Sequence, residues 1–172
     1  MGHTPGSEEA WVLTTQAAKE TKRLGALLAP FLRPGDIIAL RGDLGAGKTT
    51  FVQGVARGLG ITRPVTSPSF ILINEYPSTP PLFHIDCYRL EDADAEARDI
   101  GLEDLLYDDG VCVIEWADRV ATLLPPERID ITLMWLGPDE REIEVRGHGT
   151  RYTALVRKLR QEWQAIHEAR DS

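Results

Sequence analysis

A glycine-rich run is the part of the sequence whose residue types most directly imply chemistry. Its residues, Gly42-Asp43-Leu44-Gly45-Ala46-Gly47-Lys48-Thr49, match the Gly-x-x-x-x-Gly-Lys-Ser/Thr pattern of a phosphate-binding loop. In such a loop, backbone N–H groups and the positive end of the following helix surround phosphate oxygens. Lys48 is expected to reach the β- and γ-phosphates of a nucleotide, and Thr49 to give its hydroxyl to Mg²⁺. The alternative, a tight turn with a surface lysine, is disfavoured by the apolar run before the loop and the helical pattern after it.

Two acidic residues stand where a nucleotide-bound magnesium ion needs a carboxylate. Asp86 and Glu115 each end an apolar run, over residues 82–86 and 111–115. Ligands of parallel α/β sheets bind at the carboxyl ends of the strands, so either acid can coordinate the metal while the other positions or activates water. Taken alone, either acid could instead be a solvated residue that ends a strand and has no functional role. We predict Lys48, Asp86 and Glu115 as catalytic residues, and Thr49, Asp86 and Glu115 as metal ligands.

Other features bear on the nucleotide. The segment Val65-Thr66-Ser67-Pro68-Ser69-Phe70 is either a switch loop that senses the γ-phosphate or an ordinary turn. Arg141 either contacts the adenine or phosphates or belongs to a surface ion pair. The Asn/Thr-Lys-x-Asp and Asp-x-x-Gly motifs of guanine-specific proteins are absent from the sequence, which favours ATP. The predicted nucleotide-binding residues are Asp43, Leu44, Gly45, Ala46, Gly47, Lys48, Thr49, Thr50, Ser67 and Arg141.

The periodicity of apolar residues predicts the elements that position this chemistry. Strands are expected over residues 36–41, 70–76, 82–87 and 111–115. Residues 128–136 and 141–146 predict an antiparallel hairpin with Ile129, Ile131, Leu133 and Trp135 facing inward. Helices are expected from a cap at Thr14 or Thr15 to Phe31, over residues 48–59 with Gly60 as the stop, over 93–107 with an interruption near Gly101, and over 152–166.

This order of elements predicts an α/β fold of the P-loop NTPase type. The expected fold has a mainly parallel central sheet flanked by helices, a C-terminal antiparallel hairpin and a terminal amphipathic helix. The 172 residues suit a single domain over residues 11–172 behind a flexible tail over 1–10. The tail lacks a secretory signal, and no apolar run approaches the roughly 20 residues that span a bilayer. We therefore expect a cytoplasmic protein that does not bind a membrane. Cys87 and Cys112 are expected to be buried free thiols.

The charge of the chain is concentrated in one segment. The sequence has 19 Lys and Arg against 27 Asp and Glu, a net charge of −8. Residues 86–109 contain ten acids but only Arg89 and Arg98 as basic residues, so the rest of the chain is neutral. A chain without an excess of Lys and Arg binds the phosphate backbone of a nucleic acid weakly. Any nucleic acid is therefore expected to be bound by a partner protein. The acidic segment 91–109 is either a solvated helical face or a docking surface for a basic partner.

Four segments together carry a resemblance to a known family. They are residues 40–51, Thr66-Ser67-Pro68-Ser69-Phe70, His84-Ile85-Asp86-Cys87-Tyr88-Arg89-Leu90 and Ile114-Glu115-Trp116. In this order they resemble the motifs of the bacterial TsaE (YjeE) family of the tRNA threonylcarbamoyladenosine pathway. Ala117 stands where the family often has proline, and the N-terminal tail and C-terminal helix extend beyond the motifs.

The resemblance implies a magnesium-dependent ATPase that acts on the TsaD–TsaB complex. Because the sequence places no arginine at the γ-phosphate, we predict that hydrolysis by the chain alone is slow and that the complex stimulates it. That complex attaches a threonylcarbamoyl group to adenosine 37 of tRNAs that read ANN codons, so this chain would meet tRNA only through its partners. The resemblance also implies that Lys48 and Thr49 hold the nucleotide and Mg²⁺, that Glu115 completes the metal site, and that Asp86 positions or activates water. Trp116 either stacks or fills the partner interface, or it belongs to the core. The alternatives are a nucleotide-gated assembly module with incidental hydrolysis and a small-molecule kinase.

Overall fold

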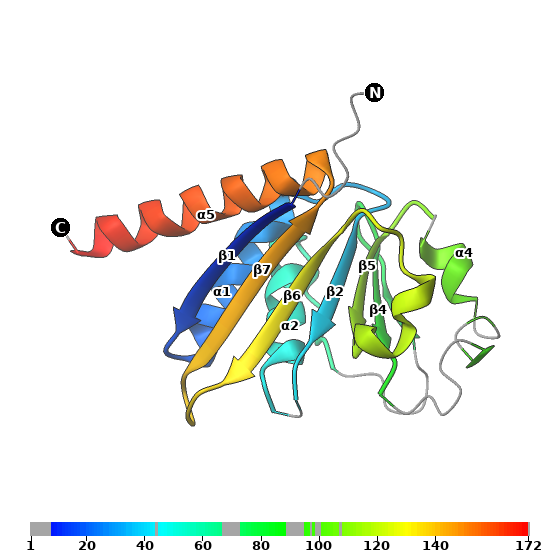
Figure 1. Cartoon of the computed structure of the whole chain (residues 1–172), viewed down its shortest axis with the longest axis horizontal. Coiled ribbons are helices and arrows are strands. Elements are labelled where there is room, and N and C mark those ends of the chain that lie inside the picture. The colour runs from blue at the N-terminus through cyan, green and yellow to red at the C-terminus, as the bar shows by residue number, and fades with distance from the viewer. Residues whose placement is uncertain are drawn as a thin grey trace.

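The strands of the molecule form one mixed sheet with helices on both faces. A computed structural model describes residues 8–43, 45–66, 73–88, 95–96, 98, 101–106 and 108–171, with side chains up to residue 168. In this described part the strand order is β1-β7-β6-β2-β5-β4-β3 (Figure 1). The strands are β1 (Glu8–Thr15), β2 (Ile37–Arg41), β3 (Ile73–Tyr76), β4 (Leu82–Asp86), β5 (Val111–Glu115), β6 (Arg128–Trp135) and β7 (Arg141–His148). The helices are α1 (Ala18–Leu28), α2 (Lys48–Gly58), α4 (Leu102–Leu106) and α5 (Thr150–Asp171), with 3-10 helices η1 (Ala29–Phe31) and η2 (Ala117–Leu123).

Strand β2 lies at the centre of the parallel part of the sheet. It pairs in parallel with β5 on one side and with β6 on the other, and β4 pairs in parallel with β5. Nearly every side chain of β2, β4 and β5 is buried. Strands covered on both faces need apolar residues at successive positions, which the three sequence runs supply. The glycine-rich loop therefore leaves the sheet from a strand with neighbours on both sides.

The sheet is less parallel than the sequence predicts. The pairs β1–β7, β6–β7 and β3–β4 are antiparallel, so half of the pairings between the described strands run in each sense. The predicted C-terminal hairpin is confirmed as β6 and β7. Strand β1 extends this hairpin, with Glu8 opposite His148 and Thr15 opposite Arg141. The hairpin, the added strand β1 and the β3–β4 pair together make the sheet mixed.

The start of the chain differs from the prediction. A helix capped at Thr14 or Thr15 is wrong, because these residues end strand β1 and the helix begins at Ala18. Strand β1 also begins at Glu8, inside the segment that we expected to be a tail. Its buried residues, Trp11 among them, alternate with exposed ones, as a strand with one covered face requires.

Two apolar clusters cover the two faces of the sheet. One cluster includes residues of α1, α2 and α5, and the other includes residues of α4 and η2. Helices α1 and α2 approach each other closely at glycines. A Cβ atom on Gly54 would lie 1.9 Å from the carbonyl oxygen of Lys22, and one on Gly25 would lie 2.4 Å from that of Phe51. Both distances are below van der Waals contact, so this close packing of α2, the helix that follows the loop, requires glycine at both positions.

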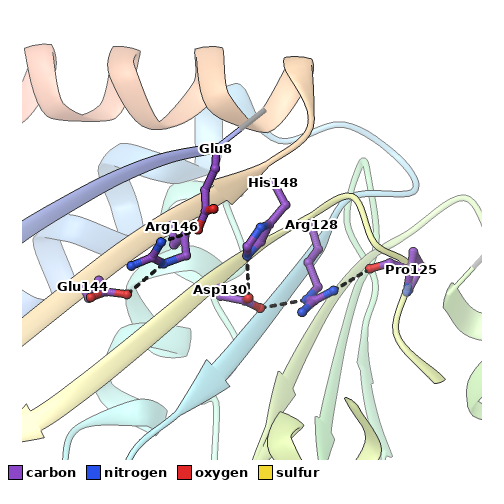
Figure 2. A network of polar contacts seen from close by, with 7 residues as sticks. All are labelled: Glu8, Pro125, Arg128, Asp130, Glu144, Arg146 and His148. Atoms are coloured by element: carbon purple, nitrogen blue, oxygen red, sulfur yellow. Dashed lines mark hydrogen bonds and ion pairs between the residues drawn. The ribbon is translucent and has the colours of Figure 1, made fainter. Parts of the chain in front are cut away.

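The other face of β1, β6 and β7 is polar. Figure 2 shows two groups of contacts on it: Arg146 pairs with Glu8, and Asp130 binds both Arg128 and His148. The Arg128 Nε–Asp130 Oδ1 and His148 Nε2–Asp130 Oδ2 distances are both 2.8 Å. An antiparallel sheet can keep one face in water. The helices are therefore needed only on the face that carries the apolar side chains.

The tip of the hairpin breaks the predicted alternation. Ile129, Ile131 and Leu133 are buried as expected, but Trp135 is 56% exposed. Leu133 is the last residue of β6 in an apolar cluster, so the buried face of the strand ends before Trp135. Cys87 and Cys112 are buried free thiols, which confirms that prediction.

The predicted helical region 93–107 is described only in part. Helix α4 follows Gly101, whose φ of +82° marks the expected interruption. Residues 70–72 of the predicted third strand and most of the acidic segment 91–100 lie outside the described residues. The proposed docking role of that segment therefore stays a prediction.

Asp36 joins the C-terminal helix to the start of β2. Its side chain is buried and accepts hydrogen bonds from the backbone N–H of Arg33 at 2.7 Å and from the Tyr152 hydroxyl at 2.8 Å. It also pairs with the guanidinium of Arg151, whose Nε lies 3.1 Å from Oδ1. Burial, with a further contribution from the Asp36 charge, raises the pKa of Tyr152. This carboxylate thus satisfies donors from two elements that are far apart in sequence.

Replacing Asp36 with alanine is expected to lower the free energy of unfolding by about 3 kcal/mol, because it leaves buried donors without their acceptor. Urea denaturation measures the loss. The Glu9→Ala variant is the control, since it removes an exposed ion pair with Arg157 at 3.3 Å that also links α5 to the sheet. Its loss should stay below about 1 kcal/mol. Equal losses in the two variants would contradict the role given to Asp36.

Candidate functional site

The glycine-rich loop connects β2 to α2 and has the backbone that its sequence predicts. Gly42 has a φ of +145°, and a Cβ atom there would lie 2.5 Å from the carbonyl oxygen of Leu133. Gly47 has a φ of +99° and is the N-cap of α2. Helix α2 begins at Lys48, so its first N–H groups face the loop, where a helix terminus favours an anion. The described part of the loop can therefore hold phosphate groups.

Lys48 is buried beneath this loop. Its Nζ donates a hydrogen bond to the carbonyl oxygen of Asp43 at 2.9 Å and another to that of Gly42. The same Nζ lies 4.2 Å from the centroid of the Trp116 ring. Burial lowers the pKa of Lys48, and the nearby charge of Glu115 partly opposes this shift. A buried ammonium group so close to the helix terminus adds positive charge at the place where phosphate would bind.

Thr49 and Glu115 meet at the edge of the sheet. The Thr49 hydroxyl lies 3.3 Å from each carboxylate oxygen of Glu115. Glu115 ends β5 and is only 3% exposed. The parallel pairing of β2 with β5 brings Glu115 opposite Leu40, two residues before the first glycine of the loop. The predicted hydroxyl and carboxylate are thus brought together from residues far apart in sequence.

Asp86 ends the neighbouring strand β4 and lies opposite Glu115 in the sheet register. Its Oδ1 accepts a hydrogen bond from the backbone N–H of Tyr88 at 2.9 Å. Burial is the largest cause that raises the pKa of Asp86, and the negative charge of Glu115 adds to it, while the Tyr88 hydrogen bond acts in the opposite direction. The two acids therefore sit side by side in different environments.

The site has the ligand types of a nucleotide-bound magnesium ion. In the described part of the chain, no group of three or more His, Cys, Asp or Glu side chains is arranged to hold a metal by itself. Magnesium in such sites is bound by one or two protein oxygens, with phosphate and water completing its shell. The hydroxyl of Thr49 and the carboxylate of Glu115 fit this requirement.

Trp116 follows Glu115 with an uncommon backbone conformation. Its φ of +59° is in the left-handed region, which costs energy for a residue with a side chain. The ring packs against the apolar cluster of η2 and α4 and lies 4.8 Å, between centroids, from the ring of Tyr88. Since the ring also contacts Lys48, Trp116 connects the apolar core to the lysine of the glycine-rich loop.

Arg141 binds the loop from strand β7. Its guanidinium donates hydrogen bonds to the carbonyl oxygens of Gly45 and Ala46, both at 3.1 Å. It also donates to the carbonyls of Gly137 and Glu140, at 2.7 and 2.8 Å. In the described structure it makes these hydrogen bonds rather than the surface ion pair that was the alternative. Arg141 thus fastens the hairpin turn to the loop.

A small pocket opens beside this contact. Its lining comes from the start of α1, the end of the loop and the hairpin turn. The lining residues are Ala18, Thr21, Gly47, Thr50, Pro138, Asp139 and Arg141. The predicted binding residue Thr50 therefore lines the same pocket as Arg141, beside the glycine-rich loop.

The other predicted binding residues divide into two groups. Asp43, Gly45 and Ala46 lie in the described loop, where their carbonyl oxygens accept hydrogen bonds from Lys48 or Arg141. Leu44 and Ser67 lie outside the described residues. The same holds for residues 67–70 of the predicted switch loop, so its role stays a prediction.

Comparison with known proteins assigns the chain to a family. A family model described as "Threonylcarbamoyl adenosine biosynthesis protein TsaE" matches residues 15–143. The chain belongs to the TsaE family. It is 49% identical over 142 residues to the tRNA threonylcarbamoyladenosine biosynthesis protein TsaE of Bacillus subtilis, which covers 82% of this chain and 88% of that protein. It is 43% identical to the Treponema pallidum protein of the same name over 76% of this chain and 96% of that protein.

A solved structure agrees with this TsaE assignment. The crystal structure of Bacillus subtilis YdiB superposes with a TM-score of 0.77 at 40% sequence identity, covering 93% of this chain and 99% of that one. The α/β architecture, with its mixed sheet, C-terminal hairpin and terminal helix, is shared with YdiB. Within the described residues, no helix has the length and apolarity needed to cross a lipid bilayer.

One residue of the site was missed by sequence reasoning, although the TsaE motif contains it. His84 on β4 is fully buried, and its Nε2 bonds to Oε2 of Glu115. The available signal was its position two residues before Asp86 in a strand, since residues i and i+2 share a face. A histidine within an apolar run is otherwise easily taken for a core residue.

Proposed function

We propose that this chain is a magnesium-dependent ATPase that acts in tRNA threonylcarbamoyladenosine biosynthesis in the cytoplasm. The observation that carries the proposal is the approach of the Thr49 hydroxyl to within 3.3 Å of both carboxylate oxygens of Glu115, at the helix terminus behind the glycine-rich loop. This contact supports a phosphate site beside the kinds of oxygen ligand that a nucleotide-bound Mg²⁺ uses. On this proposal the fold is of the P-loop NTPase type.

The loop and Lys48 would bind the triphosphate. Lys48 exchanges its two carbonyl acceptors for phosphate oxygens, while the N–H groups of the loop and of the first turn of α2 donate to the others. Arg141 keeps the loop in shape through its carbonyl contacts. The contribution of Leu44 and Ser67 belongs to the same proposal.

The two acids would divide the remaining roles according to their surroundings. Glu115 contacts Thr49 and is assigned with it to the Mg²⁺ site, where the bound ion neutralises charge on the phosphates. Asp86 does not share that contact, and burial raises its pKa, which makes it the better proton acceptor. We therefore assign Asp86 to orienting the attacking water and accepting its proton.

The activating charge would come from a partner. Phosphoryl transfer gains roughly a thousandfold or more from an arginine at the γ-phosphate, but Arg141, which lies against the loop, already donates to four carbonyl oxygens. We propose slow hydrolysis by the chain alone and stimulation by a TsaD–TsaB-type complex, which modifies adenosine 37 of tRNAs that read ANN codons. A chain of net charge −8 would reach tRNA only through that complex.

The deciding experiment follows phosphate release from γ-labelled ATP by the full chain, with and without a TsaD–TsaB pair. Free phosphate should form slowly alone and at least tenfold faster with the pair, and ATP should promote their co-purification. Equal turnover under both conditions would contradict partner activation. Transfer of the label to a metabolite would indicate a small-molecule kinase instead.

A further inference from the structure

A buried histidine, His84, contacts the carboxylate that faces Thr49. His84 is 0% exposed and Glu115 is 3% exposed. His84 lies opposite Val113 in the register of β4 and β5, so Glu115 is two residues further along the partner strand. Residues two apart share a face of a sheet. His84, Asp86 and Glu115 therefore point to the same face, which is the face that packs α2.

Hydrogen bonding indicates which ring nitrogen of His84 carries the proton. Nε2 bonds to Oε2 of Glu115, while Nδ1 is buried and has no hydrogen-bond partner among the described residues. A carboxylate accepts hydrogen bonds, so Nε2 is the donor. The ring nitrogen that faces Glu115 is therefore assigned a proton.

We infer that His84 is a positioning residue that holds the Glu115 carboxylate for Mg²⁺. The inference rests on the proposed function, because it concerns the same metal site. The hydrogen bond takes one oxygen of Glu115 and fixes the rotation of the carboxylate, while both oxygens stay within 3.3 Å of the Thr49 hydroxyl. Without this hydrogen bond the Glu115 carboxylate could turn away from Thr49. The free-energy cost of fixing its orientation would then weaken metal binding.

Outer partners of metal ligands commonly change metal affinity by about 10- to 100-fold when they are removed. Removal of the Nε2 donor should therefore raise the Mg²⁺ concentration that the site needs by about tenfold. It should not change how the loop holds phosphates in the absence of metal, because His84 contacts Glu115 and not the loop. The contribution of His84 is thus separable from that of Lys48.

The test compares His84→Gln, His84→Asn and His84→Leu by calorimetry with a non-hydrolysable ATP analogue. Glutamine can place an amide N–H near the position of Nε2, asparagine is too short to do so, and leucine has no donor. Affinity in EDTA should stay within about twofold of wild type in all three variants. Mg²⁺ should increase the affinity for the analogue, and the Mg²⁺ concentration that gives half of this increase is the measured quantity. It should rise about tenfold for the asparagine and leucine variants and stay near the wild-type value for the glutamine variant.

The control is Ile85→Ala, which disturbs the same strand on its opposite face, where Ile85 is fully buried. It should lower thermal stability without moving the Mg²⁺ requirement. Unchanged Mg²⁺ requirements in the asparagine and leucine variants would overturn the inference, as would an equal shift for glutamine or for the control. If leucine prevents folding, the asparagine–glutamine pair decides. A wild-type chain that binds the analogue without any response to Mg²⁺ would instead contradict the proposed function.

Discussion

The Lys48→Ala variant is expected to lose adenine-nucleotide binding by about 100-fold or more. Lys48 is the buried cation at the start of α2, with two carbonyl acceptors from the loop. In the proposed complex it makes charge-assisted hydrogen bonds to phosphate, each worth about 1.5–3 kcal/mol, and no neighbouring group would replace them. Calorimetric titration of ATP and ADP in EDTA measures this loss separately from any effect of metal.

The matched control for this variant is Lys158→Ala, which removes an exposed lysine from α5. Its nucleotide affinity should equal that of wild type. Melting temperatures of both variants show whether the fold is intact, since Lys48→Ala also removes hydrogen bonds to the loop. A folded Lys48→Ala chain with wild-type affinity would rule out the loop as the phosphate site.

The Glu115→Gln variant should hydrolyse ATP about 100-fold more slowly, or slower still, while it keeps its affinity for nucleotide in EDTA. The substitution keeps the volume of the side chain but removes the charge that faces Thr49. Loss of one well-placed electrostatic contact in an active site typically costs 10²–10³ in rate. Steady-state phosphate release at saturating ATP and Mg²⁺, with the TsaD–TsaB pair present, measures the effect.

Glu144→Gln is the matched control, because Glu144 lies on the polar face of the sheet and pairs there with Arg146. Its hydrolysis rate should be unchanged. The Glu115 variant also separates two functions. One outcome is that the variant binds ATP without hydrolysing it and still supports repeated tRNA modification. In that case ATP binding drives assembly with the TsaD–TsaB pair, and the chain acts as a nucleotide-gated module rather than as an ATPase.

The parts of the candidate site whose positions could be predicted from the sequence are those coded by short-range patterns. The glycine spacing before Lys48 determines loop conformation locally, and Glu115 could be placed because acids that end parallel strands collect at one edge. These positions required only the type of each element and the direction of its strand. The contact between Thr49 and Glu115 also needs β2 to lie beside β5, which the local patterns do not specify.

The parts that were missed depend on which strands are neighbours. Periodicity places the start of β1 in a tail and its last residues at a helix cap, because the strand that pairs with it, β7, comes from the far end of the chain. The hydrogen bond of His84 requires that β4 lie beside β5, and the Arg141 contacts require that the hairpin turn lie beside the loop. Hydrophobic periodicity carries no information about these long-range arrangements.

The strand order has a consequence for the newly made protein. Strand β2 and its glycine loop leave the ribosome early, but the strands that flank β2 begin only at Val111 and Arg128. The guanidinium that fastens the loop, Arg141, is synthesised later still. A polypeptide that stops before Val111 therefore has the complete glycine-rich loop but neither of the strands that flank β2. If the proposed function holds, a growing chain should bind ATP only after the hairpin has been synthesised.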